Sequence, residues 1–211
     1  MNDFFKQPNR ILAVIGTAGR DKTQPMDQDL WYAMCDDLRE RISPNDHLVS
    51  GGAAWADHLA VHAFDKGWVK QLTLFLPAPM GQAGFIGPQR SAANAANFYH
   101  RKFSAITRIR SYAQLRDVVR APGVTVYEEP IRPGYGAMFA RNKKIARLAD
   151  SVLAYTFGQG EAPADGGTLD TWQQINCADK AHVNLIQLAQ EYRAKLYENE
   201  PEAERERFVF Q

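Results

Sequence analysis

The sequence predicts an α/β fold in which a parallel sheet is covered by helices on both faces. Short apolar runs alternate along the chain with longer segments whose apolar residues recur at helical spacing, and this order is typical of parallel sheets. Three of the apolar runs, at residues 11–15, 47–49 and 151–155, lead into glycine-rich turns. Because parallel strands end at the same edge of a sheet, we expect these turns to lie near one another.

The first half of the chain predicts three strands joined by two helices. Residues 10–16 are apolar on both faces, as in a strand buried within a parallel sheet. Apolar side chains recur at helical spacing over residues 30–42, which predicts the first helix. The second strand covers residues 47–49, a helix follows it as far as Gly67, and residues 71–76 form the third strand.

The middle of the chain is less regular and predicts a partly helical insertion at about residues 80–135. Helical spacing covers residues 94–106 and 112–119, and a short strand covers residues 124–127. Seven basic residues and one acid lie between positions 90 and 120, and they form either a solvated helical face or a positive rim facing an anionic ligand. The basic residues are Arg90, Arg101, Lys102, Arg108, Arg110, Arg116 and Arg120.

The regular alternation returns in the last third of the chain. A helix is predicted over residues 137–149, a strand over 151–155, a helix over 169–180 and a last strand over 183–188. Beyond residue 190, Glu alternates with Arg and Lys in a helical pattern. This pattern predicts a surface helix or a subunit contact.

The composition is that of an ordinary globular protein. A chain of 211 residues with 45% hydrophobic residues suits one packed domain, which we place at residues 1–190, followed by a helical tail at 191–211. The net charge of +1 gives no reason to expect nucleic acid or a membrane as partner. The sequence shows neither a signal-peptide pattern nor an apolar stretch near the ~20 residues of a membrane span. We therefore expect a cytoplasmic protein, and Cys35 and Cys177 as small buried residues.

The glycine-rich turns form the predicted binding site. A glycine lets the backbone approach a ligand without a Cβ atom, and the start of the following helix offers free N–H groups to a phosphate. The alternative is that these glycines serve only the turns themselves. The predicted phosphate-binding residues are Gly16, Thr17, Gly19 and Arg20 after the first strand, Ser50, Gly51, Gly52 and Ala53 after the second, and Gly166, Gly167 and Thr168 beyond residue 155.

Side chains beside the second turn leave three questions open. Asp57 stands one turn into its helix, where it either bonds a ribose hydroxyl or caps the helix. Trp55 either stacks on a base or packs in the core. His58 and His62 share one helix face, but no third ligand stands in a metal-site spacing, so we expect no metal.

Four motifs occur along the chain in a fixed order: Ile-Gly-Thr-Ala-Gly-Arg, then Val-Ser-Gly-Gly-Ala-Ala-Trp-Ala-Asp-His-Leu-Ala, then Arg141-Asn142, then Gly166-Gly167-Thr168. Over about residues 10–80 and 137–188 the chain resembles the SLOG superfamily. That superfamily includes DprA/Smf DNA-processing proteins, LOG "lysine decarboxylase-like" phosphoribohydrolases and nucleotide-ligand sensors. The resemblance implies a Rossmann-like sheet with a nucleotide-type ligand at the ends of its strands, and a ligand-binding role for Arg141 and Asn142.

The resemblance also frames the question of catalysis. The LOG-type motif is Gly-Gly-x-Gly-Thr-x-x-Glu, and aligning its Gly-Thr on Gly167 and Thr168 places Thr171 where the glutamate would be. Asp170 is one position away, and one step on a helix rotates a side chain by ~100°. An adjusted loop could still present Asp165 or Asp170 to a scissile glycosidic bond as the catalytic carboxylate.

The sequence therefore favours a binding protein over an enzyme. We expect a nucleotide-derived small molecule containing phosphate and ribose, bound by a sensor, carrier or sequestering protein that forms a homo-oligomer and holds no further cofactor. The first alternative is an N-glycosidic hydrolase of nucleoside monophosphates. The second is a DprA-like DNA-binding protein with the basic middle segment as its footprint, which the near-neutral net charge disfavours.

Overall fold

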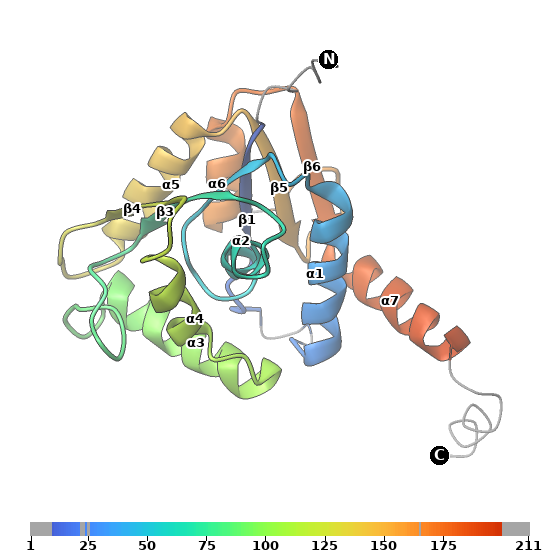
Figure 1. The fold of residues 1–211 in the computed structure, drawn as a ribbon, viewed down its shortest axis with the longest axis horizontal. Coiled ribbons are helices and arrows are strands. Elements are labelled where there is room, and N and C mark those ends of the chain that lie inside the picture. The colour runs from blue at the N-terminus through green and yellow to red at the C-terminus, as the bar shows by residue number, and fades with distance from the viewer. Residues whose placement is uncertain (1–9, 22–23, 25, 165, 200–211) are drawn as a thin grey trace, which may run out of the picture.

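The computed structural model describes residues 10–21, 24, 26–164 and 166–199. Within them, six strands form one sheet in the order β4-β3-β2-β1-β5-β6, and every neighbouring pair is parallel (Figure 1). The predicted α/β, Rossmann-like fold is confirmed. The strands are β1 Ile11–Gly16, β2 His47–Ser50, β3 Gln71–Leu76, β4 Val124–Glu128, β5 Ser151–Thr156 and β6 Asp179–Asn184.

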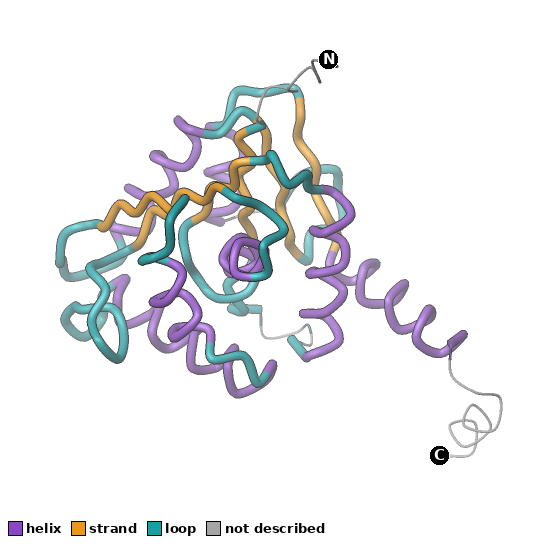
Figure 2. Tube along the Cα trace, viewed as in Figure 1, coloured by secondary structure: helices purple, strands orange, loops and turns teal. Residues whose placement is uncertain are grey.

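Helices cover both faces of the sheet (Figure 2). One face packs against α1, α2, α3, α4 and α7, and the other packs against α5 and α6. Neighbouring residues of β1 alternate between the two faces, as the pleat requires, with Val14 in the first core and Ile15 in the second. The helices are α1 Gln28–Arg41, α2 Ala56–Asp65, α3 Ala92–Thr107, α4 Ser111–Val118, α5 Gly136–Leu148, α6 Gly166–Gln174 and α7 Leu185–Asn199.

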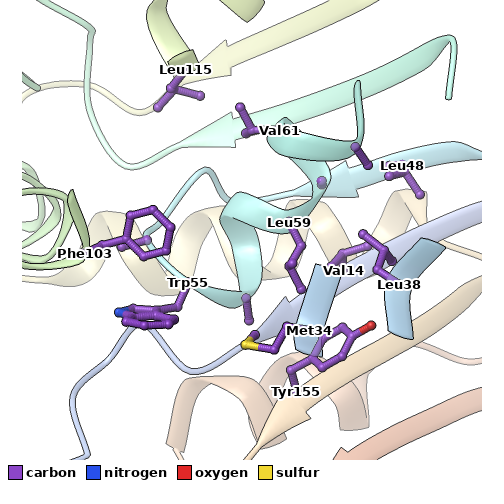
Figure 3. Packing of buried hydrophobic residues seen from close by; sticks show 14 of the residues in the cluster. Val14, Met34, Leu38, Leu48, Trp55, Leu59, Val61, Phe103, Leu115 and Tyr155 are labelled. Atoms are coloured by element: carbon purple, nitrogen blue, oxygen red, sulfur yellow. The ribbon is translucent and has the colours of Figure 1, made fainter. Parts of the chain in front are cut away.

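The α2 helix lies inside the larger core, where its residues are buried on nearly every side. At its start, the rings of Trp55 and Phe103 meet edge to face, with centroids 4.9 Å apart (Figure 3). Trp31 packs against both rings. Trp55 is only 1% exposed, so core packing is the role that the structure gives it. His58 and His62 also pack against the Trp31 ring, which explains two histidines on an interior helix.

The order of the strands creates a switch point between β1 and β5. The chain steps outward from β1 through β2, β3 and β4, and then returns to place β5 on the other side of β1. Loops that leave neighbouring strands in opposite directions diverge, and the crevice between them is where open α/β sheets bind ligands.

Two elements near the C-terminal end were predicted wrongly. The last strand is β6, Asp179–Asn184, rather than residues 183–188, and the preceding helix ends at Gln174 rather than at residue 180. The apolar run that predicted a strand is the first turn of α7, whose Leu185 and Ala189 are buried in the core. Asn184 accepts a hydrogen bond from the backbone N–H of Ile186 and thereby starts that helix.

Candidate functional site

A cavity of about 470 Å³ lies at the carboxyl ends of β1 and β5, at the switch point of the sheet. It lies between the loops that follow these two strands and the first turns of α5 and α6. Most of the predicted site residues line it. They are Gly16, Thr17, Arg20, Ala53, Asp57, Arg141, Asn142, Gly166, Gly167 and Thr168.

Four predicted residues, Gly19, Ser50, Gly51 and Gly52, do not line the cavity. The buried Ser50 hydroxyl lies 2.8 Å from the carbonyl oxygen of Val14 and serves the turn itself. Gly52 has a φ of +64°, and a Cβ atom there would lie 2.5 Å from Leu76. At these positions the structure shows turn and core packing.

Arg141 reaches from α5 across the cavity floor to the turn after β2. Its Nη1 donates to the carbonyl oxygen of Gly51, and its Nη2 lies 3.4 Å from Oδ2 of Asp57. The same Asp57 oxygen accepts from the backbone N–H of Ala53 at 3.3 Å. The buried ion pair therefore ties α5, α2 and the β2 turn into one rigid floor.

Burial dominates the electrostatics of this ion pair. Burial raises the pKa of the Asp57 carboxyl above its ordinary value, against the lowering effect of Arg141. Burial also lowers the pKa of the Arg141 guanidinium, against the raising effect of Asp57. Within the described residues, Nε of Arg141 is buried without a hydrogen-bond partner. Because a buried, unpaired donor is costly, an anion that met this guanidinium would be stabilising.

The first turn of α6 forms a second polar wall. The hydroxyl of Thr168 donates to the carbonyl oxygen of Gly16 at 3.1 Å, which joins α6 to the end of β1. The side-chain amide of Asn142 donates to the carbonyl oxygen of Gly167 at 3.3 Å, which joins α6 to α5. Backbone N–H groups in the first turn of a helix have no partner within that helix, so this wall offers donors to a ligand.

An aromatic rim is the part of the site that the sequence analysis missed. Tyr135 and Phe139 line the cavity and are 51% and 55% exposed. Phe139 stands three residues before Asn142 on the same face of α5, and Tyr135 is the N-cap residue one turn before Phe139. That spacing was visible in the sequence and would have identified the rim once Asn142 was placed in the site. Arg20 lies at the same mouth, with its Nη2 3.2 Å from the sulfur of Met138.

The structure describes one of the two carboxylates that the sequence analysis offered as catalytic. Asp170 lies on α6 and is not among the lining residues, and Asp165 lies outside the described residues. Thr171, which aligns with the glutamate of the LOG-type motif, does line the cavity, and its hydroxyl donates to the carbonyl oxygen of Gly167. Among the described residues, the carboxylates that line the cavity are Asp21 and Asp57.

The other predicted features lie away from the cavity. None of the seven basic residues between positions 90 and 120 lines it.

Among the described residues, no group of three or more His, Cys, Asp or Glu side chains is placed to hold a metal ion. Cys35 and Cys177 are free thiols, the first buried and the second half-buried. No helix in the described part of the chain is both long and apolar enough to span a membrane.

Comparisons with known proteins show what this chain is similar to. No family model matches the sequence. The uncharacterized protein R261 of Acanthamoeba polyphaga mimivirus is 34% identical over 183 residues, which cover 82% of this chain and 95% of that protein. Among solved structures, the chain is similar to DNA processing protein A from Helicobacter pylori, described for its single-stranded DNA binding mode. The TM-score is 0.41 at 15% identity, and the match covers 88% of this chain and 81% of that one.

Proposed function

The chain belongs to the same family as the mimivirus protein, and we propose that it binds a nucleotide-derived small molecule in the cavity between β1 and β5. The ligand contains a phosphate and a ribose, and the protein acts as its sensor, carrier or sequestering protein. The observation that carries this proposal is the cavity itself. It joins a buried arginine with an unpartnered donor to a pair of exposed aromatic rings, at the switch point of a parallel sheet.

The polar floor and the α6 wall suit one phosphate. The guanidinium of Arg141 and the free N–H groups at the start of α6 are both donors for anionic oxygens. Among the described residues, the charged side chains that line the cavity are Arg20, Arg141, Asp21 and Asp57, two of each sign. With two cations and two carboxylates among these described residues, we propose a monophosphate rather than a di- or triphosphate as the ligand.

The aromatic rim suits the base of the same ligand. Stacking of a base on an aromatic side chain is worth about 1–3 kcal/mol and tolerates different bases. Tyr135 is the N-cap residue of α5 and Phe139 lies in the first turn of that helix. Both are exposed at the cavity, so they can offer ring faces without rearrangement of the core. A cavity of about 470 Å³ has the size of an ordinary small-molecule site.

Calorimetric titration with AMP, GMP, CMP and IMP tests the proposal. Wild-type protein is expected to bind at least one of them, and Phe139→Ala is expected to weaken that binding about tenfold through lost stacking. The matched control is Phe98→Ala, because Phe98 is 52% exposed on α3 and does not line the cavity. Equal losses in the two variants, or no binding of any of the four nucleotides, would remove the support for this function.

Hydrolysis of the N-glycosidic bond is the second candidate, favoured by one observation. Asp57 is a buried carboxylate with a raised pKa that lines the cavity, which is the setting of a general acid or base. Chromatography after incubation of nucleoside monophosphates with the protein tests it. Multiple turnover that is abolished by Asp57→Asn and retained in Asp170→Asn would replace the binding function with a catalytic one.

A further inference from the structure

We infer that Thr156 determines ligand specificity by accepting a hydrogen bond from an O–H or N–H group of the ligand, and that it repels phosphate oxygens. This inference rests on the proposed function, because it assigns the orientation of a ligand in the same cavity. Thr156 is the last residue of β5, and it lines the cavity at the switch point. None of the motifs in the sequence included it.

A chain of three hydrogen bonds fixes the Thr156 hydroxyl. Its Oγ1 lies 2.7 Å from Nε2 of His182 on the neighbouring strand β6. The other ring nitrogen of His182, Nδ1, lies 2.7 Å from the carbonyl oxygen of Gly160. The backbone N–H of Gly158 donates to the same Oγ1 at 3.2 Å.

The direction of each hydrogen bond follows from the carbonyl group. The Gly160 oxygen can only accept, so Nδ1 of His182 carries the hydrogen. In the neutral ring Nε2 is then an acceptor, and the hydroxyl of Thr156 must donate to it. The opposite tautomer would set two lone pairs against each other between His182 and Gly160 at 2.7 Å. The edge of the Trp172 ring, 6.5 Å away between centroids, packs beside the imidazole.

The hydroxyl hydrogen of Thr156 is therefore engaged with His182, and a ligand in the cavity meets only the oxygen atom Oγ1. Of the two lone pairs on Oγ1, one faces the N–H group of Gly158, so a single acceptor position remains for a ligand. The phosphate of a nucleoside monophosphate loses its last proton with a pKa of about 6, so at pH 7.5 nearly all its free oxygens lack a hydrogen and would set their lone pairs against this one. The phosphate is thus directed to the Arg141 floor, and a donor such as a ribose hydroxyl or an amine of the base lies at Thr156.

The proton arrangement can be measured without any ligand. Nitrogen-15 NMR of the histidine rings distinguishes a protonated from an unprotonated ring nitrogen, and His182→Gln identifies the signals of His182 among those of the five histidines. At pH 7.5 the expected result is a protonated Nδ1 and an unprotonated Nε2. A protonated Nε2 on a neutral ring would overturn the inference.

Binding measurements test the consequence for the ligand. Thr156→Val removes the acceptor at nearly constant shape and is expected to weaken AMP binding about three- to tenfold. Thr156→Ser should restore it, and Thr125→Val, the same change at an exposed position of β4, should leave it unchanged. The affinity for inorganic phosphate should be the same in all four proteins. Unaltered AMP binding in Thr156→Val, or an equal loss for phosphate, contradicts the inference.

Analogues identify the donor and separate this inference from the proposed function. If the donor is a ribose hydroxyl, the effect of Thr156→Val disappears with 2′-deoxy- or 3′-deoxy-AMP. If the donor is the amine of the base, it disappears with IMP. Persistence of the full effect with all three analogues would contradict a ligand donor at Thr156. If the wild-type protein binds no nucleoside monophosphate, the proposed function fails. The tautomer of His182, measured by NMR without ligand, then shows independently whether Oγ1 of Thr156 is free to accept a hydrogen bond.

Discussion

At the scale of single residues, the Arg141–Asp57 pair is the feature on which the site floor depends. Both side chains are buried. The hydrogen bonds and the ion pair that they form all lie in the floor of the cavity. Buried ion pairs add little net stability compared with apolar residues, but removal of one partner leaves an uncompensated charge. The pair is therefore strongly coupled, whatever its net contribution.

A double-mutant cycle measures this coupling. Arg141→Gln is expected to lower the free energy of unfolding by about 3 kcal/mol, because it leaves Asp57 buried and unpaired. Adding Asp57→Asn should recover about 1–2 kcal/mol of that loss. Urea unfolding provides the measurement.

The Arg116–Asp117 pair is the matched control. Its charged atoms are also 3.4 Å apart, but its side chains are 33% and 67% exposed. Water and salt screen such a pair, so its coupling energy should stay below about 1 kcal/mol. Similar coupling energies for the two pairs would show that burial does not set the energetics of the floor.

Two buried histidines predict an acid-sensitive fold. Burial lowers the pKa of His58 to about 3 and that of His100 to about 4, from an ordinary value of 6.5. The unfolded chain binds protons at both positions as the pH falls below 6.5, while the folded chain does not, so stability decreases as the pH falls from 6.5 towards 4. A positive charge on His62 further lowers the pKa of His58, and the positive charge of Arg141 further lowers the pKa of His100.

Urea unfolding at pH 7 and pH 5.5 checks this dependence. The wild-type protein is expected to lose about 2 kcal/mol over this interval from the two histidines together. His100→Asn should reduce that loss by about half, whatever its effect on stability at pH 7. An unchanged loss in this variant would mean that His100 does not titrate as its burial implies.

The sequence was enough to predict site residues that stand in a motif. It was not enough to predict residues whose contacts depend on the register between two strands. Gly16, Gly166 and Gly167, three of the six predicted glycines, line the cavity from turns that follow predicted strands, and Arg141 and Asn142, which the family resemblance indicated, line it too. The contact between Thr156 and His182 depends on which residue of β6 lies beside the end of β5. Register between strands distant in the chain is a tertiary property, and the wrong position predicted for the last strand hid it.

At the scale of elements, the glycine turns have two different functions. Gly52 adopts a φ of +64° and lies against Leu76, so the turn after β2 needs it for folding. Gly167 lies in the first turn of α6 with Asn142 as its nearest neighbour, and it faces the cavity. The same substitution at the two positions therefore separates folding from binding.

Alanine at each glycine gives opposite results. Gly52→Ala is expected to destabilise the fold by about 1–3 kcal/mol, because the added Cβ meets a core side chain in a left-handed conformation. Gly167→Ala should leave the melting temperature unchanged or slightly higher, because alanine is the better helix former. It should weaken AMP binding, since the methyl group lies where a phosphate would approach the backbone. Thermal melting and calorimetry of both variants provide the measurements. A normal melting temperature for Gly52→Ala would contradict a folding role for this glycine.

At the scale of the whole molecule, the winding of the chain decides where a ligand can bind. The regular alternation of strands and helices was visible in the sequence, and it fixed the parallel sheet and the edge at which the turns lie. The strand order was not visible, because nothing local to β5 says that it pairs with β1 rather than with β4. That pairing creates the switch point, and with it the cavity.

Amide NMR of the nitrogen-15-labelled full chain, titrated with AMP, GMP, CMP and IMP, shows whether a nucleotide binds at the switch point of the sheet. We expect at least one of these nucleotides to shift the backbone amide signals of Gly16, Thr17, Gly158 and Gly167 together, while the signals of residues 101–120 stay unchanged. The contradicting result is either no shift with any of the four, or shifts confined to residues 101–120 on addition of a single-stranded oligonucleotide. That second outcome would move the binding function to the basic segment and away from the switch point.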